Sequence, residues 1–553
     1  MQQPKALLVA EESEHMMVVR FILLFIFLSF PKAWANNLQL SNLDEVNINT
    51  AANAMTFSCN LSQDNSWYNS YNFDAVWVFM KYSPDGGATW KHAHMAGSGI
   101  NPAGFSLPAA FQNQFEIVVP SDQTGFFVQR TGPGTGNINL TGLQFVWNYG
   151  QDGVSSALAQ AANTLHTVYG IEMVYVPQGA FQAGDGNGNF SNEYPLGGAN
   201  PWYIQSERAI TTTASGSAYY YQNSGASGDE YPNGAVFTVP ASYPKGFNAF
   251  YLMKYELTEG QWVSFFNTLP LAVRPYRDIT SNNLGGKNSQ GVVYRNTISW
   301  NAGLPSSPAT TSRPSRPVSF VSWPDVAAYA AWAALRPITE LEFEKAARGK
   351  DNQPLAGEYV WGSTAITAAT SGGIVPNADE NGVETLSDGS NINANAGGFS
   401  SGDGRSGGIA AGQAGPLRVG IFAASASNPT RQSSGSGFYG NMELSGDLAQ
   451  PVVTVGRPES VGNFQGTNGT GNLNVSGFAT NNDWPGFNPA TSQVDHTIGI
   501  GYRGGDFLSP STTVFMTSAR TYAVRDPDSQ GCAQRYSSTC GVFQGGRLGR
   551  SAS

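Results

Sequence analysis

Charged residues are scarce in this sequence. Asp, Glu, Lys and Arg together make up 12% of the 553 residues, and the formal net charge at pH 7 is −10. Proteins that bind nucleic acid usually carry a stripe of Lys and Arg that neutralises phosphates, so this composition argues against a nucleic-acid partner. Few charges combined with 65 glycines and 12% aromatic residues favour a loop-rich extracellular protein over a cytosolic enzyme.

Cysteine is nearly absent, with three residues in the whole chain. In an exported protein Cys532 and Cys540 could close a short loop as a disulfide, which would leave Cys59 as an odd thiol buried in a strand. Histidine is also rare. His92 and His94 stand two apart and would share one face of a strand, but nothing in that segment completes a metal-binding triad. We therefore interpret them as a surface pair.

Residues 1–35 have the pattern of a secretory signal. Arg20 precedes an apolar core at 21–28, and Ala33-Trp34-Ala35 has the small-residue spacing of a cleavage site. A membrane anchor is the alternative, but the apolar run is shorter than the ~20 residues that span a bilayer. We expect cleavage after Ala35, no membrane span in the mature chain, and a secreted, periplasmic or cell-surface location.

Residues 36–165 have the pattern of an all-β domain. Short apolar runs alternate with turn residues, and the strongest strand signal lies at 74–82, followed by a turn at 84–87. The spacing predicts a β-sandwich. A polar, alanine-rich stretch at 155–165 is interpreted as a linker or short helix, which places a second domain at 166–553.

Two capped helices are predicted near the middle of the chain. Residues 318–321 favour a strand, and Ser322 can cap a helix that Pro337 must end. Thr339 then caps a second helix, with Glu342 three residues later as a capping box. The glutamates at 340, 342 and 344 alternate on this helix, and we interpret them as capping plus a solvated face.

The run 316–349 resembles the sulfatase-modifying-factor family, the formylglycine-generating-enzyme type of C-type lectin fold. The resemblance covers about 170–553 and continues in ordered blocks at 171–184, 250–262, 437–450 and 502–551. It implies an α+β, loop-rich, C-type-lectin-like domain at 166–553, preceded here by the all-β sandwich-like domain.

The family's oxidase members use two cysteines between the block like Arg503-Gly504-Gly505 and the one like Ala519-Arg520, and these bind copper as thiolates. Here that window, 506–517, contains no cysteine. Serine and threonine cannot replace a thiolate as soft ligand or redox group. We therefore expect no copper site and favour a protein that is not an enzyme.

The resemblance also implies structural calcium near the block at 437–450. Its positions fall on Asp447, a good ligand for a hard cation, and on Gln450, which offers a carbonyl without charge. A second stretch, 185–189, alternates Asp, Gly and Asn, and is interpreted as a turn.

We predict an exported, non-catalytic binding or assembly protein whose partner is an unknown protein or glycan. The ending at 545–551 resembles relatives with a hypervariable C-terminal patch, which implies a diversified ligand-binding surface. The alternatives are a metal-dependent oxidase of the formylglycine-generating type and a structural envelope component. The exposed contacts would be Asp506, Phe507, Leu508, Ser509, Ser511, Thr513, Phe515, Thr517, Tyr522, Arg525 and Tyr536.

Overall fold

The fold comes from a computed structural model of the chain. It describes residues 37–185, 201–214, 219–224, 230–280, 295–350, 353–369, 374–375, 385–386, 392–396, 415–426, 429–507, 509, 511–524 and 543–552. The expected leader at 1–35, the candidate disulfide of Cys532 and Cys540, and most of the turn at 185–189 lie outside these residues.

Two sheets face each other in the N-terminal part of the chain. The smaller one has the order β1 (Gln39–Asn49), β2 (Ala54–Tyr68), β8 (Gly134–Trp147). Every second residue over the first half of β2 is buried, and Phe57 and Cys59 pack with Val76 and Val78 of the facing sheet. Successive side chains of a strand point to opposite faces, so this alternation gives the small sheet one apolar face. The two sheets enclose an apolar core, as in a sandwich.

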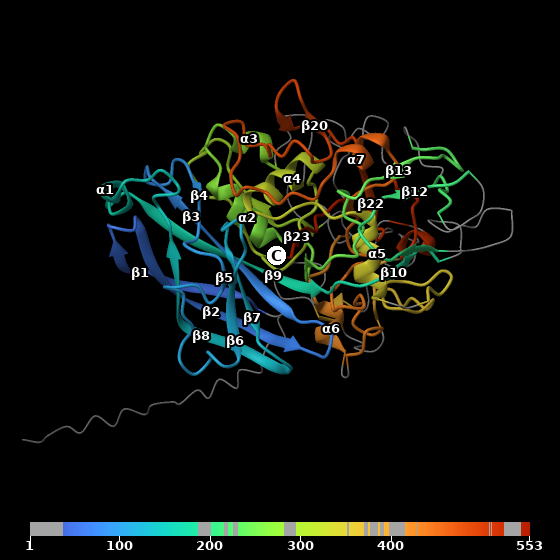
Figure 1. Cartoon of the computed structure of the whole chain (residues 1–553), viewed down its shortest axis with the longest axis horizontal. Coiled ribbons are helices and arrows are strands. Elements are labelled where there is room, and N and C mark those ends of the chain that lie inside the picture. Colours follow the sequence, from blue (N-terminus) through green and yellow to red (C-terminus); the bar gives the residue numbers. More distant parts are fainter. Residues whose placement is uncertain are drawn as a thin grey trace, which may run out of the picture. The chain divides into compact units, whose positions relative to one another are not determined.

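The larger sheet joins the N-terminal and C-terminal parts of the chain. Its order is β23–β14–β9–β3–β7–β6–β5, with β4 paired to β3. Its strands are β3 (Asp74–Ser83), β4 (Lys91–Ala93), β5 (Gly99–Ile100), β6 (Phe115–Val119), β7 (Phe126–Arg130), β9 (Leu165–Val176), β14 (Phe250–Met253) and β23 (Gly549–Ser551), and Figure 1 labels all of them except β14.

The expected domain boundary coincides with the start of a strand in this shared sheet. β9 begins at Leu165 and pairs antiparallel with β3 over the full length of β3, from Asp74 opposite Val174 to Ser83 opposite Leu165. Residues on both sides of position 165 also belong to one compact unit, 35–553. The two predicted domains therefore share a sheet, and the division of the chain into domains at 36–165 and 166–553 stays a prediction.

Strand β3, predicted at 74–82, is buried on both faces. Val76 and Val78 point into the sandwich core, whereas Trp77 and Phe79 point into the core of the C-terminal part. The indole Nε1 of Trp77 donates to the carbonyl oxygen of Ala333 at 2.9 Å. One strand thus ties the two apolar cores together.

Helices cover both faces of the sheet around β9 and β14. Helices α2 (Glu259–Thr268) and α4 (Trp323–Trp332) pack in the core that contains Met173 of β9. Helix α5 (Glu340–Arg348) places Phe343 in a second core with Val174 and Leu252, on the opposite face. The architecture is a mixture of helices and sheets.

The helix caps predicted at Ser322 and Thr339 are confirmed, and Thr258 caps helix α2 in the same way. Thr258, Ser322 and Thr339 each begin a helix with a capping box, which pairs backbone N–H groups that the first turn leaves unsatisfied. Gly349 ends α5 with φ of +85°, and a Cβ there would lie 2.4 Å from the ring of Phe438. Only glycine suits this position.

The strand expected at 318–321 is not formed. Phe320 has φ of +64°, a left-handed conformation that interrupts an extended strand. Val318, Phe320 and Val321 are instead buried in the core beneath α4. Apolar β-branched and aromatic residues suit a buried position as well as a strand, and here packing decides.

The remaining elements are short. They are α1 (Ser156–Ala159), β10 (Phe181–Ala183), β11 (Trp202–Ile204), β12 (Ile210–Thr211), β13 (Thr238–Val239), α3 (Arg274–Arg277), β15 (Ile298–Ser299), β16 (Thr310–Thr311), β17 (Ile374–Val375), β18 (Thr385–Leu386), α6 (Ile421–Ser425), β19 (Gln450–Val453), α7 (Pro458–Asn463), β20 (Phe487–Asn488), β21 (Gln493–Val494), β22 (Ile500–Arg503) and the 3-10 helix η3 (Thr512–Phe515). None of the helices described here is long and apolar enough to cross a membrane.

Candidate functional site

Helix α5 points its glutamates into the protein. Glu340, Glu342 and Glu344 are 0%, 2% and 0% exposed, so the expected solvated face is wrong. Glu342 closes the helix cap and pairs with Arg336, with 2.6 Å between Nη2 and Oε1. A buried carboxylate is costly unless it is paired and hydrogen-bonded, and arginines supply that pairing here.

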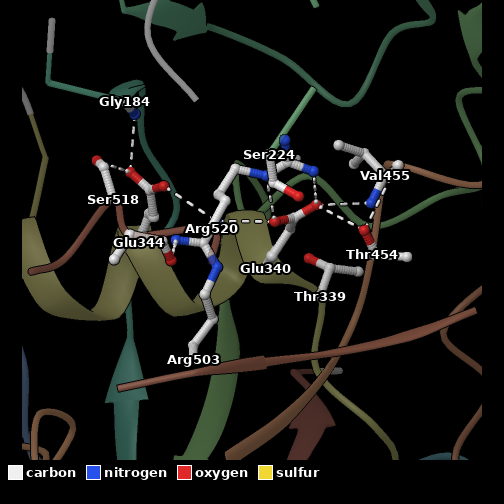
Figure 2. A network of polar contacts seen from close by, with 12 residues as sticks. Gly184, Ser224, Thr339, Glu340, Glu344, Thr454, Val455, Arg503, Ser518 and Arg520 are labelled. Carbon is white, nitrogen blue, oxygen red and sulfur yellow. Dashed lines mark hydrogen bonds and ion pairs between the residues drawn. The ribbon is translucent and has the colours of Figure 1, made fainter. Parts of the chain in front are cut away.

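Glu340 lies between two arginines of the C-terminal segment (Figure 2). Its Oε2 accepts from Nη2 of Arg503 at 2.8 Å and from Nε of Arg520 at 3.0 Å. Its Oε1 accepts from the backbone N–H of Val455 at 2.7 Å and the hydroxyl of Thr454 at 3.1 Å. Burial alone would raise the pKa of Glu340, but Arg520 and Arg503 outweigh it and hold the pKa below its ordinary value.

Glu344, one turn further along α5, extends the same network (Figure 2). It accepts from Nη2 of Arg503 at 3.3 Å, from the backbone N–H of Gly184 at 2.8 Å and from the hydroxyl of Ser518 at 3.1 Å. Arg348 pairs with Glu344 and also donates to Ser518. The network thus fastens both ends of the segment 503–520 to one helix.

Most of the expected contact residues in this segment face inward. Asp506, Phe507, Ser509, Phe515 and Thr517 are buried, so they do not form an exposed surface. The backbone explains this placement, because the N–H groups of Phe507 and Thr517 donate to the carbonyls of Asp447 and Glu358 at 2.9 and 2.8 Å.

A short turn is the part of the segment that reaches solvent. Ser511 and Thr513 are exposed and Tyr522 is partly exposed, as the sequence predicts. The turn is held from within: the hydroxyl of Ser511 accepts the backbone N–H of Thr513 at 3.3 Å, and Phe515 is fully buried. Leu508, Arg525 and Tyr536 lie outside the described residues.

A sequence model described as "Sulfatase-modifying factor enzyme 1-like domain" matches residues 160–377. This chain contains a sulfatase-modifying factor enzyme 1-like domain. Two relatives are both named "Formylglycine-generating enzyme". The one from Thermomonospora curvata is 45% identical over 64 residues, and the one from Streptomyces coelicolor is 55% identical over 53 residues. The aligned stretches cover 12% and 9% of this chain, and 20% and 16% of the relatives.

The sulfatase-modifying factor-like part offers no thiol in the segment fastened to α5, since 506–517 contains no cysteine. Cys59 lies in β2, with its side chain in the sandwich core. Burial raises the pKa of the Cys59 thiol to about 12, so it stays protonated at neutral pH. It therefore has neither the position nor the ionisation state of a thiolate ligand.

The expected calcium ligands lie in a buried polar region. Oε1 of Gln450 accepts from Nε of Arg547 at 2.7 Å, and Nε2 of Gln450 donates to the carbonyl oxygen of Glu443 at 2.8 Å. Oδ1 of Asp447 accepts the backbone N–H of Leu417 at 2.8 Å. Gln450 therefore does not fit as a ligand. The described ranges contain no group of three His, Cys, Asp or Glu side chains arranged to hold a metal.

Two further carboxyl groups crowd around Asp447. Burial, followed by the charge of Asp447, raises the pKa of Glu443 to about 8 and that of Glu256 well above its ordinary value. One carboxyl oxygen on each is buried and has no hydrogen-bond partner in the described part of the chain. The three carboxyl groups are not arranged as a metal site, and calcium beside Asp447 stays a prediction that rests on the resemblance.

The two neighbouring histidines do not form a surface pair. His92 is 1% exposed; its Nε2 lies 2.5 Å from the carbonyl oxygen of Thr124, and its Nδ1 lies 2.9 Å from Nζ of Lys81. His94 contacts a carboxylate, with Nδ1 2.5 Å from Oδ1 of Asp152. The two rings do share a side of the strand, with centroids 5.9 Å apart.

Proposed function

We propose that the chain is exported and acts by binding rather than by catalysis, on a sulfatase-modifying factor scaffold of the C-type-lectin-like kind. The observation that carries the proposal is the absence of cysteine from 506–517, in a segment whose surroundings otherwise resemble the family. The oxidase reaction needs soft thiolate ligands there, and hydroxyl groups cannot supply them. The leader pattern ending at Ala35 supports export.

The way in which the segment is held favours recognition. Arg503 and Arg520 fix its two ends on Glu340, while Ser511 and Thr513 stand exposed between them. A rigidly supported loop loses little conformational freedom on binding, which favours affinity. The partner would be a protein or glycan that contacts this turn and Tyr522.

The proposal includes calcium as a structural ion only. Asp447 would be its one side-chain carboxylate ligand, and Gln450 would not take part. Such an ion would balance the negative charge of Asp447, and it would take no part in a reaction.

A second candidate function is a metal-dependent oxidase. The observation in its favour is that both relatives reported above are named formylglycine-generating enzyme. This candidate requires a thiol pair from outside 506–517, which in this chain means Cys532 and Cys540.

Copper titration of the purified mature chain separates the two candidates. We expect no stoichiometric, tight copper binding in the wild type, and the same trace in a Cys532→Ser/Cys540→Ser variant as matched control. Tight binding of one copper that the double variant loses would overturn the binding proposal. Saturable binding on a glycan array would identify a glycan ligand, whereas capture of exported partner proteins would favour an assembly role.

A further inference from the structure

A cavity lies between the sandwich and the C-terminal part, away from the segment 506–524. Its volume is about 470 Å³. One wall comes from β3, β4 and the turn before β4, with Tyr82 and Trp90 among its residues. The opposite wall comes from the end of α2 and the loop 471–477. Small-molecule sites in proteins typically measure ~300–1,000 Å³, so this cavity has the size of a binding site.

The loop wall is fixed in place by contacts to the strand wall. The carbonyl oxygen of Gly471 accepts from Nζ of Lys81 at 2.5 Å, and Oδ1 of Asn472 accepts the backbone N–H of His92 at 3.0 Å. Gly471 has φ of +81°, and a Cβ there would lie 2.0 Å from the ring of His92. Its N–H also donates to Ala331 of α4 at 2.8 Å. The cavity is therefore formed before any ligand arrives.

Several groups that line the cavity have unused binding capacity. Within the described part of the chain, the hydroxyl of Tyr82 and the ammonium of Lys91 make no hydrogen bond, and the half-buried indole of Trp90 contacts no other aromatic ring. Nδ2 of Asn472 makes one long contact, at 3.5 Å, to the carbonyl of Thr470. The cavity thus offers an aromatic face together with hydroxyl, amide and ammonium donors.

We propose that this cavity binds a saccharide unit of one or two rings, with the Trp90 indole against the sugar ring and Tyr82, Lys91 and Asn472 as hydrogen-bond donors to its hydroxyls. Sugars present apolar C–H faces and a rim of hydroxyls, which matches an aromatic platform beside polar groups. One lysine is too little charge for a polyphosphate, and an acyl chain would leave the polar groups of Tyr82, Lys91 and Asn472 without hydrogen-bond partners. This proposal does not depend on whether the chain is an oxidase.

A carbohydrate platform at Trp67, Tyr68 and Tyr71 is a weaker candidate because those rings already have partners or structural roles. Phe73, next to them, is stacked between Tyr68 and Tyr175, with centroids 5.0 and 4.7 Å away. Tyr71 is 42% exposed and packs on Phe438 at 5.5 Å. Tyr71 therefore serves as a matched control: an exposed aromatic residue that does not line the cavity.

The test is titration of the full mature chain with glucose, galactose, N-acetylglucosamine, glucuronate and their β-linked disaccharides to about 10 mM, followed by isothermal calorimetry and tryptophan fluorescence. We expect saturable binding of at least one of them. Trp90→Ala should weaken it by about fivefold or more and Tyr82→Phe by about threefold, while Tyr71→Ala should bind like the wild type.

Thermal melts of each variant check folding, and Trp90, being half-buried, should tolerate alanine. Two results would overturn the proposal. One is the absence of saturable binding for every sugar on this panel. The other is binding that Tyr71→Ala abolishes and Trp90→Ala leaves unchanged, which would place the sugar site elsewhere. Failure of the copper experiment would leave this test unaffected, because no cavity residue belongs to the segment 503–524.

Discussion

Replacing Glu340 with glutamine keeps the shape of the side chain and removes its charge. Arg503 and Arg520, both 2% exposed or less, would then face a neutral amide. The NH2 group of this amide cannot accept a hydrogen bond from a guanidinium N–H. Removing one partner of a buried ion pair costs ~3–5 kcal/mol, because the other charge stays buried without compensation.

The expected shift in melting temperature follows from the size of the unit. For a compact unit of this length, the entropy of unfolding is about 1 kcal/mol/K, so we expect Glu340→Gln to lower Tm by about 3–5 °C. Glu459→Gln is the matched control. Glu459 is 49% exposed on its side chain and lies 3.4 Å from Nε of Arg457. Its loss should cost ~1 kcal/mol or less and move Tm by about 1 °C at most.

The effect should depend on pH with a defined sign. In the folded protein the pKa of Glu340 lies below its ordinary value of 4.5. A depressed carboxyl pKa contributes stability that is present above the unfolded pKa and is lost as pH falls through the folded pKa. The gap in Tm between wild type and Glu340→Gln should therefore be full at pH 7 and shrink below about pH 4.

Differential scanning calorimetry at pH 7 and at about pH 3.5 measures this gap. Equal Tm for Glu340→Gln and wild type at pH 7 would refute the idea that the carboxylate holds the segment in place. A gap that widens on acidification would refute the sign of the pKa argument.

Three further predictions concern other parts of the chain. Cys59 should resist thiol reagents in the native state and react in denaturant, because its pKa is about 12 and its side chain is buried. Peptide mapping distinguishes Cys59 from the other cysteines. Fast labelling of Cys59 in the native protein would contradict its burial. Residues 36–165 expressed alone should not fold cooperatively, because they lose the pairing of β3 with β9 and expose Trp77. A sharp thermal transition of this fragment, followed by circular dichroism, would show instead that it is an independent domain. Calcium should raise the Tm of chelator-treated protein, and Asp447→Asn should abolish this rise. Identical melting curves with and without calcium would show that the protein has no structural calcium site.

The features predicted correctly from the sequence are local ones. The capping box at Thr339 and the cap at Ser322 depend on residues three positions apart, so the sequence carries the whole signal. The strand at 74–82 is also visible as a long apolar run, because β3 is buried on both faces.

The features missed from the sequence depend on distant partners. Glu340 was expected at a solvated face, and its burial follows from Arg503 and Arg520, more than 160 positions away. The pairing of β3 with β9 across the expected domain boundary is equally non-local. The sequence does carry a usable signal, because three glutamates within five positions of a chain with 12% charged residues form an unusual concentration of charge.

The sequence predicts where along the chain the candidate site lies, but not which of its side chains are exposed to solvent. The family blocks on either side identify the window 506–517, and the structure fastens Arg503 and Ser518, which flank this window, to α5. Which residues face solvent depends on backbone hydrogen bonds to Asp447 and Glu358, which no periodicity in the window reveals. Hence Ser511 and Thr513 are exposed, whereas Phe507 and its buried neighbours are not.

The central claim is that this scaffold binds and does not oxidise. The most direct test incubates the mature chain with copper, a reductant, oxygen and a cysteine-containing peptide, and looks for formylglycine in the peptide by mass spectrometry. Our account predicts unmodified peptide, with the same result for Cys532→Ser/Cys540→Ser. Repeated turnover to formylglycine by the wild type, lost in the double variant, would contradict it.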